Sequence, residues 1–133
     1  MYEYIKGPVA ELTPTFVVVD SAGVGYYVNI SLQTYSSFEG KKEIQVYLHQ
    51  VVREDAHLLF GFASKDEREL FRLLISVSGV GANTARVILS SMSAPEIQKA
   101  IQSADINALK QIKGIGLKTA QRIVVDLKDK VFG

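Results

Sequence analysis

The sequence predicts an α+β protein in two parts, a small five-stranded β-barrel followed by an all-α domain. Runs rich in β-branched and aromatic residues, separated by glycine turns, fill the first half and are typical of strands. Apolar residues at helical spacing fill the second half, where a short glycine phrase occurs twice. We therefore expect residues 1–63 to form the barrel and residues 64–133 to form the helical domain.

Five runs in the first part have the composition of strands. They are Tyr2–Leu12, Thr15–Asp20, Val24–Ile30, Ile44–Leu48 and Leu58–Phe62. The first run is expected to bend or break at Gly7-Pro8, because proline has no N–H to donate to a ladder. Five strands in so short a segment favour a closed barrel, since closure removes the exposed edges of an open sheet. Sharp bends of the barrel are expected at three glycines, namely Gly7, Gly25 and Gly61.

Helix start signals recur through the second part. Ser64 and Glu67 have the spacing of a capping box. An apolar stripe at helical spacing follows them, at Leu70, Phe71, Leu74 and Ile75. Ser93 and Glu96 repeat the capping-box spacing, and Asp105 can cap a short helix further on. Together with the helices that follow the two glycine phrases, five helices are expected.

The repeated glycine phrase is the most informative motif of the chain. It reads Gly79-Val80-Gly81-Ala82-Asn83-Thr84-Ala85 and, 35 residues later, Gly114-Ile115-Gly116-Leu117-Lys118-Thr119-Ala120. The pattern describes a tight hairpin between two short helices. The helix after each hairpin begins with unpaired N–H groups, which form a ready site for a phosphate. Two copies suggest a module that holds a nucleic-acid backbone at two places, and the alternative is a pair of compact helical turns without a ligand.

The helix after the first phrase is expected over about residues 83–91, and the helix after the second phrase is expected to run from the end of Gly114-Ile115-Gly116 to about residue 130. In the second helix, Lys118 and Arg122 lie four residues apart on one face. Four apolar residues of the same helix are expected to face the core, namely Ala120, Ile123, Val124 and Leu127.

The net charge of +1 conceals an asymmetry between the two parts. Residues 1–63 carry four Lys/Arg and seven Asp/Glu, a net −3, whereas residues 64–133 carry eleven and seven, a net +4. Four basic residues surround the second glycine phrase, namely Lys110, Lys113, Lys118 and Arg122. This distribution favours an anionic partner for the second part over an ordinary solvated helix face.

Composition excludes several other classes of protein. The chain has no cysteine, so disulfides and thiolate metal sites are excluded, as expected for a cytoplasmic protein. It has no apolar run of membrane-spanning length, no secretory signal at its start and no Walker-type ATP-binding sequence. His49 and His57 lack metal-ligand spacing, so neither a metal nor a cofactor is expected.

The order of these motifs resembles the bacterial RuvA family, which binds Holliday junctions in recombination, DNA repair and the SOS response. The resemblance is carried by the two glycine phrases and by three segments of the first part: Tyr4–Gly7, Gly23–Tyr26 and Arg53–Phe62. It implies an OB-type barrel, two helix-hairpin-helix motifs and a homotetramer, possibly an octamer on DNA, with one subunit facing each quadrant of the junction. The family continues into a third helical domain that contacts the hexameric ATPase motor RuvB, and this domain is expected to be missing here.

The resemblance also implies roles for named residues. DNA phosphates would be bound by Gly79, Gly81, Asn83, Thr84, Gly114, Gly116, Lys118, Thr119 and Arg122. Glu54 and Asp55 would form an acidic pin near the tetramer axis, although on the residues alone Glu-Asp is a common solvated turn. Many relatives carry basic residues where this chain has Asn83 and Leu117, and Arg86 is a candidate to compensate.

Three other functions fit the sequence less well. A helix-hairpin-helix glycosylase is disfavoured because Asp126 lies only ten residues past Gly116, and a nuclease because no acidic metal-binding cluster is present. A single-strand-binding barrel would need exposed aromatics and a basic groove, but the first part is acidic. Its aromatic residues Phe16, Tyr26, Phe60 and Phe62 fit strand patterns of a core. The main alternative is a helix-hairpin-helix scaffold that binds duplex DNA without preference for junctions.

Overall fold

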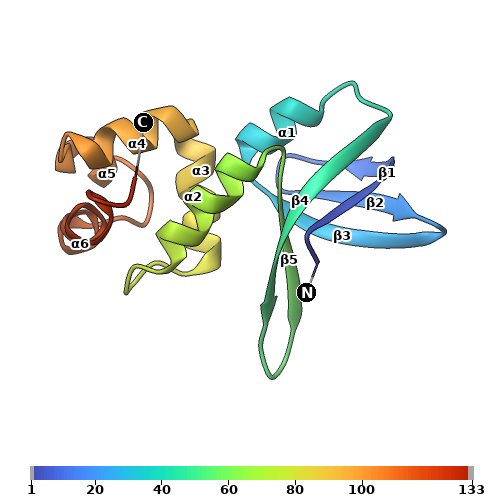
Figure 1. Cartoon of the computed structure of the whole chain (residues 1–133), viewed down its shortest axis with the longest axis horizontal. Helices are drawn as coiled ribbons and strands as arrows, with labels where there is room; N and C mark the ends of the chain where they lie inside the picture. Colours follow the sequence, from blue (N-terminus) through green and yellow to red (C-terminus); the bar gives the residue numbers. More distant parts are fainter. Residues whose placement is uncertain (1, 132–133) are drawn as a thin grey trace. The chain divides into compact units, whose positions relative to one another are not determined.

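The computed structural model of the protein describes residues 2–131. The chain folds into two compact units, which divide between Arg68 and Glu69. The first unit contains a closed β-barrel and the second contains only helices (Figure 1). This confirms the expected α+β fold. The division falls within the helix α2 (Lys65–Ile75), whereas the sequence placed the boundary after Ala63.

Five strands make up the barrel. They are β1 (Tyr4–Leu12), β2 (Phe16–Ser21), β3 (Val24–Ile30), β4 (Glu43–Val52) and β5 (His57–Phe62). Their order around the barrel is β1-β2-β3-β5-β4. All neighbours are antiparallel except β3 and β5, which pair in parallel at Asn29–Phe60 and Ile30–Gly61.

The first strand, for which a bend or a break is expected from the sequence, is not interrupted at Gly7-Pro8. β1 runs through Gly7 and Pro8, which pair with Ile44 and Glu43 of β4. The irregularity lies further on, where the register between β1 and β2 shifts between Val9 and Glu11. Pro8 is tolerated because the N–H of the next residue, Val9, donates toward β4, to the Lys42 carbonyl at 2.9 Å. On the other side of β1, pairing with β2 begins only at Val9, so no N–H is needed from Pro8 there.

The barrel core is mostly aliphatic, and Gly61 packs closely against it. Alternate residues of the strands point inward, and the buried set is Ile5, Val17, Val19, Val28, Ile30, Phe38, Ile44, Val46 and Leu48. A Cβ added at Gly61 would clash with the Cγ1 methyl groups of both Val28 and Val46. Gly61 is therefore required for the close packing of β5 against the core.

The helix α1 (Leu32–Phe38) lies between β3 and β4 and is absent from the sequence prediction. Ser31 caps it by accepting from the Thr34 N–H at 3.2 Å, and Phe38 buries its ring in the barrel core. Its sequence, Gln-Thr-Tyr-Ser-Ser in the middle, has low intrinsic helix propensity. The helix is thus held by its cap and by the burial of Phe38.

The start of α2 is only half of the expected capping box. Ser64 Oγ accepts from the Glu67 N–H at 3.2 Å, but the Glu67 carboxylate does not return to Ser64. It accepts instead from Thr34 Oγ at 2.7 Å and from Ser31 Oγ at 3.1 Å, which ties α2 to α1. Burial raises the pKa of Glu67 from its usual value of 4.5, and these hydrogen bonds only partly oppose the shift.

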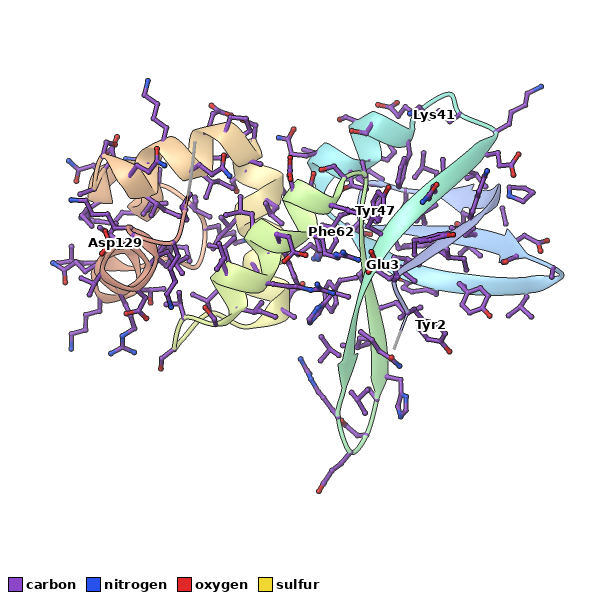
Figure 2. All side chains as sticks on the ribbon, in the orientation of Figure 1. Tyr2, Glu3, Lys41, Tyr47, Phe62 and Asp129 are labelled. Atoms are coloured by element: carbon purple, nitrogen blue, oxygen red, sulfur yellow. The ribbon has the colours of Figure 1, made fainter. Side chains whose placement is uncertain are left out.

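A buried arginine fixes the start of β1 to the same helix. Arg68 is only 4% exposed, and its guanidinium donates to the Glu3 carboxylate at 3.0 Å and to the Glu3 carbonyl at 2.9 Å. The guanidinium also lies over the ring of Tyr47, 5.7 Å from its centre. Glu3 and Tyr47 are adjacent in Figure 2. These contacts explain why residues 64–68 belong to the barrel unit.

The second unit contains the rest of α2 and four further helices. They are α3 (Ala82–Ser91), α4 (Ala94–Gln102), α5 (Ile106–Lys110) and α6 (Leu117–Leu127). The capping box of Ser93 with Glu96 and the cap at Asp105 are confirmed. α6 ends at Leu127, before the expected residue 130, and residues 128–130 form a turn. The four apolar residues expected to face the core from α6 are all buried.

Candidate nucleic-acid interface

The two glycine hairpins have the same backbone geometry. In the first, Gly79 has φ of +92°, and the Val80 N–H donates to the Val77 carbonyl at 3.0 Å. In the second, Gly114 has φ of +88°, and the equivalent hydrogen bond is 3.1 Å long. The left-handed φ explains the first glycine of each phrase, because other residues pay a steric penalty there. The apolar residues of both turns are buried and anchor the hairpins to the core.

No steric constraint within the protein requires the second glycine of each phrase. Gly81 and Gly116 are the N-caps of α3 and α6, with φ of −86° and −90° and ψ near 180°. Any residue can adopt this extended conformation. A Cβ added at either position would meet no atom of the protein within 4 Å. The open space at these two positions therefore leaves room for something outside the unit to approach the backbone closely.

Both hairpins present the N-terminus of a helix. Neither Gly81 nor Gly116 supplies a side-chain cap, so the first N–H groups of α3 and α6 are left for an external acceptor. The first helical hydrogen bonds are those from Ala85 to Gly81 and from Ala120 to Gly116, both 2.9 Å. The partial positive charge of each helix end favours an anion.

Basic side chains lie beside the second hairpin. Lys118 and Arg122 are exposed on one face of α6, as expected, and line a shallow groove of about 350 Å³ together with Gln121, Val125 and Asp126. Arg122 also donates to the carbonyl of Ser78 at 3.5 Å. Since Ser78 directly precedes Gly79, the two hairpins lie side by side. The sequence did not indicate Ser78 or Gln121, because neither carries charge.

The start of α3 differs from that of α6. Arg86 donates from Nε and Nη2 to the Asn83 Oδ1, at 3.1 and 2.8 Å. Thr84 and Thr119 are half-buried within the first turn of their helices. Leu117 begins α6 with an apolar side chain that is 50% exposed.

The Glu54-Asp55 pair forms the tip of a long β-hairpin in the barrel unit (Figure 1). Pairing of β4 with β5 extends to Val52 and His57, four residues further along β4 than the sequence indicated. The Arg53 N–H donates to the Ala56 carbonyl at 2.8 Å and closes the turn. Both carboxylates are exposed, and within residues 2–131 neither has an ion-pair partner. With the exposed Arg53 directly before the two carboxylates, the tip carries a formal net charge of −1.

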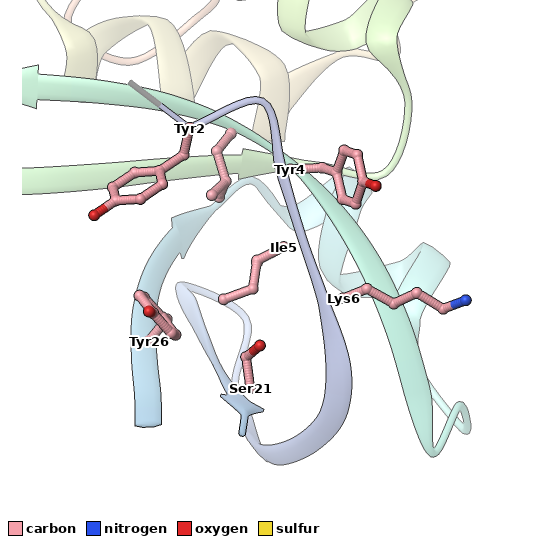
Figure 3. Close-up of a pocket in the computed structure, with 7 residues that line it drawn as sticks. Tyr2, Tyr4, Ile5, Lys6, Ser21 and Tyr26 are labelled. Atoms are coloured by element: carbon pink, nitrogen blue, oxygen red, sulfur yellow. The ribbon is translucent and has the colours of Figure 1, made fainter. Parts of the chain in front are cut away.

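A pocket of about 360 Å³ opens beside the first residues of β1. It is lined by Tyr2, Tyr4, Ile5, Lys6, Ser21, Tyr26 and Leu48. Tyr2 and Tyr26 lie on one side of β1, whereas the side chains of Tyr4 and Lys6 point to the other side (Figure 3). Lys6, the only cation among the lining residues, is thus directed away from the space between the tyrosines. The pocket lacks the basic groove that binding of single-stranded DNA requires.

Metal sites and membrane-spanning helices also bear on the class of protein. Within the described part of the chain, no group of three His, Asp or Glu side chains is placed to hold a metal ion. No helix in residues 2–131 has the length and apolar composition needed to cross a membrane.

Comparison with known proteins gives the family. The model of the RuvA N-terminal domain matches residues 1–61, and that of the SAM-like helix-hairpin-helix tandem matches residues 71–129. The Holliday junction branch migration complex subunit RuvA of Bacteroides fragilis is 59% identical over 131 residues, 98% of this chain and 65% of that protein. The protein of the same name from Parabacteroides distasonis is 61% identical over 131 residues, which are 98% of this chain and 67% of the relative.

A third relative of this name, from Christiangramia forsetii, is 53% identical over 132 residues, 99% of this chain and 68% of that protein. The chain thus spans about 65% of the length of the Bacteroides fragilis protein. Identity of this degree extends over both units, and the two domain models match in the same order as the barrel and the hairpins. The chain belongs to the RuvA family.

Proposed function

We propose that this protein binds four-way (Holliday) junction DNA through its phosphates and holds the junction open for branch migration by a partner motor. The observation that carries the proposal is the pair of hairpins in which a Cβ at Gly81 or Gly116 would meet no atom of the protein within 4 Å. A glycine with such open space around it is expected where another backbone comes close. The names of the relatives, subunits of a Holliday junction branch migration complex, support the same substrate.

The hairpins would bind one duplex arm at two places. The N–H groups at the starts of α3 and α6 would donate to phosphate oxygens, with the hydroxyls of Thr84 and Thr119 as further donors. Lys118 and Arg122 would add positive charge at the second hairpin. Arg122 lies 3.5 Å from the carbonyl oxygen of Ser78, so the two hairpins are next to each other, which suits two phosphates of one backbone.

Binding of this kind would not depend on base sequence. Backbone N–H groups and exposed cations contact phosphates, which are the same at every base pair. Affinity should fall steeply with salt, because each neutralised phosphate releases counterions. Indifference to sequence is what a junction-binding protein needs if the branch point is to move past it.

The acidic tip would give the preference for junctions. In a homotetramer with one subunit on each quadrant, four copies of Glu54 and Asp55 would bring about eight carboxylates to the crossover. Phosphates near this cluster would be repelled, so the open form of the junction would be favoured over the stacked form. The exposed, unpaired carboxylates at the end of a long β-hairpin support this role.

The protein would act as a non-catalytic, cytoplasmic subunit. Its sequence carries no Walker-type ATP-binding motif, so the energy for branch migration would come from a RuvB-type hexameric ATPase.

A competition gel-shift experiment tests the proposal. A labelled four-way junction and a labelled linear duplex of equal length are titrated with the protein in excess unlabelled duplex. We expect a stable complex with the junction and little complex with the duplex. Equal binding to the junction and the duplex would show that the protein is a general duplex-binding scaffold without preference for junctions. A Lys118→Ala variant serves as the internal reference, because it should weaken both complexes and lower the salt slope by about one.

A further inference from the structure

The two hairpins carry their cations at different positions. With the 35-residue offset of the repeat, Asn83 corresponds to Lys118, and Arg86 corresponds to Gln121. Each motif therefore has one cation and one carboxamide at the same two positions, in opposite order. Lys118 and Gln121 line one groove of α6, so positions three residues apart share an outward face in this motif. Relative to the cation of the second motif, the cation of the first motif lies about one helical turn further along that face.

In the first motif the carboxamide orients the cation. Asn83 Oδ1 accepts from both Nε and Nη2 of Arg86, at 3.1 and 2.8 Å. Asn83 is the second residue of α3, directly after the hairpin, whereas Arg86 lies in the next turn. Side chains of a helix lean toward its N-terminus, so these hydrogen bonds draw the guanidinium back toward the hairpin. Asn83 is neutral, so these two hydrogen bonds do not themselves cancel the charge of the guanidinium.

We infer that Arg86, held in place by Asn83, is the phosphate-binding cation of the first hairpin and takes the part that Lys118 has in the second. Arg86 is the binding residue and Asn83 a positioning residue. The planar guanidinium can donate two parallel hydrogen bonds to a phosphate, which the ammonium of Lys118 cannot. The inference rests on the proposed function, since it assigns a further contact of the same interface.

Charge-relocation variants test this inference. Junction affinity is measured over a range of salt for the wild type, Arg86→Gln, Asn83→Ala and the double variant Asn83→Lys with Arg86→Gln. Arg86→Gln should lower the salt slope by about 0.9, which is about an eightfold weakening at 0.1 M salt. Asn83→Ala should keep the slope and weaken binding by about twofold, the value of one helical side-chain pair. The double variant should recover most of the affinity, because the charge returns to the position of Lys118.

Lys99→Gln is the matched control, since it removes one exposed cation from α4, a helix that is preceded by neither hairpin. Circular dichroism checks that every variant is folded. The inference is overturned if Arg86→Gln keeps the wild-type affinity and slope, if Lys99→Gln has the same effect, or if the double variant stays as weak as Arg86→Gln. If the wild type selects junctions and Arg86→Gln has no effect on binding, only this inference is refuted. If the wild type binds no DNA, both the proposed function and this inference are refuted.

Discussion

Replacing Gly116 by alanine should separate what the fold requires from what bound DNA requires. The backbone at Gly116 is extended, and the new methyl group would meet no protein atom within 4 Å. Alanine is a poorer N-cap than glycine by roughly 0.5–1 kcal/mol. It also restricts the unfolded chain, which stabilises the protein by about 0.4–1 kcal/mol. The two effects nearly cancel, so we expect the free energy of unfolding to change by less than about 0.5 kcal/mol.

The same methyl group should impair DNA binding. It would occupy the space through which a phosphate reaches the first N–H groups of α6. Without that phosphate contact, binding should weaken by at least about tenfold, because a hydrogen bond to a charged group contributes about 1.5 kcal/mol or more. Gly114→Ala is the matched comparison, because Gly114 has φ of +88°. Alanine there should lower the free energy of unfolding by about 1–2 kcal/mol, the cost of a left-handed residue.

Two measurements on both variants decide the matter. Urea unfolding followed by circular dichroism gives the free energy of unfolding, and fluorescence anisotropy with a labelled four-way junction gives the affinity. Gly116→Ala should be stable and bind weakly, and Gly114→Ala should be less stable. The reasoning is refuted if Gly116→Ala loses as much stability as Gly114→Ala, or if it binds the junction like the wild type.

Three other predictions concern the barrel unit. Glu54→Gln with Asp55→Asn should keep or tighten junction binding and reduce the preference for junction over duplex in the competition gel shift; unchanged preference would remove the acidic tip from the proposed function. Burial raises the folded-state pKa of Glu67, so ionisation of this carboxyl should lower stability as pH rises from about 4.5 through the raised pKa. Glu67→Gln should therefore raise the free energy of unfolding at pH 7 but not below pH 4.5, as measured by urea unfolding at both; equal pH dependence in the two proteins would contradict this. Gly61→Ala should lower the free energy of unfolding by about 1–3 kcal/mol through the clash with two core valines, and a variant as stable as the wild type would show that β5 can shift freely.

The barrel strands and the larger helices could be predicted because their signals are local. Alternating Val, Ile and Tyr residues specify which side of a strand is buried, and the capping box at Ser93 marks a helix start by itself. The glycine repeat likewise placed both hairpins, since the left-handed turns at Gly79 and Gly114 need glycine whatever surrounds them.

The elements that were missed depend on distant contacts. α1 has a weak helical sequence and forms because Phe38 enters the barrel core and Ser31 caps its start. Glu67 has the spacing of a capping box, but hydroxyl groups more than thirty residues away bind its carboxylate. The pair formed by Arg86 and Asn83 could be read as two separate polar residues, and only the structure gives the bonds between them.

Affinity and selectivity must come from different levels of organisation under the proposed function. Each hairpin is complete within one chain, and its geometry suits the phosphates of any duplex arm. A single subunit would therefore bind junctions and linear duplexes through the same groups, with no reason to distinguish them. One exposed acidic turn in water repels DNA only weakly. The carboxylates of Glu54 and Asp55 would therefore repel phosphates effectively only when several copies meet at one crossover. It follows that variants of the hairpins should change affinity and salt dependence for both forms of DNA alike. Variants of the acidic tip, and conditions that dissociate the assembly, should change the ratio between them.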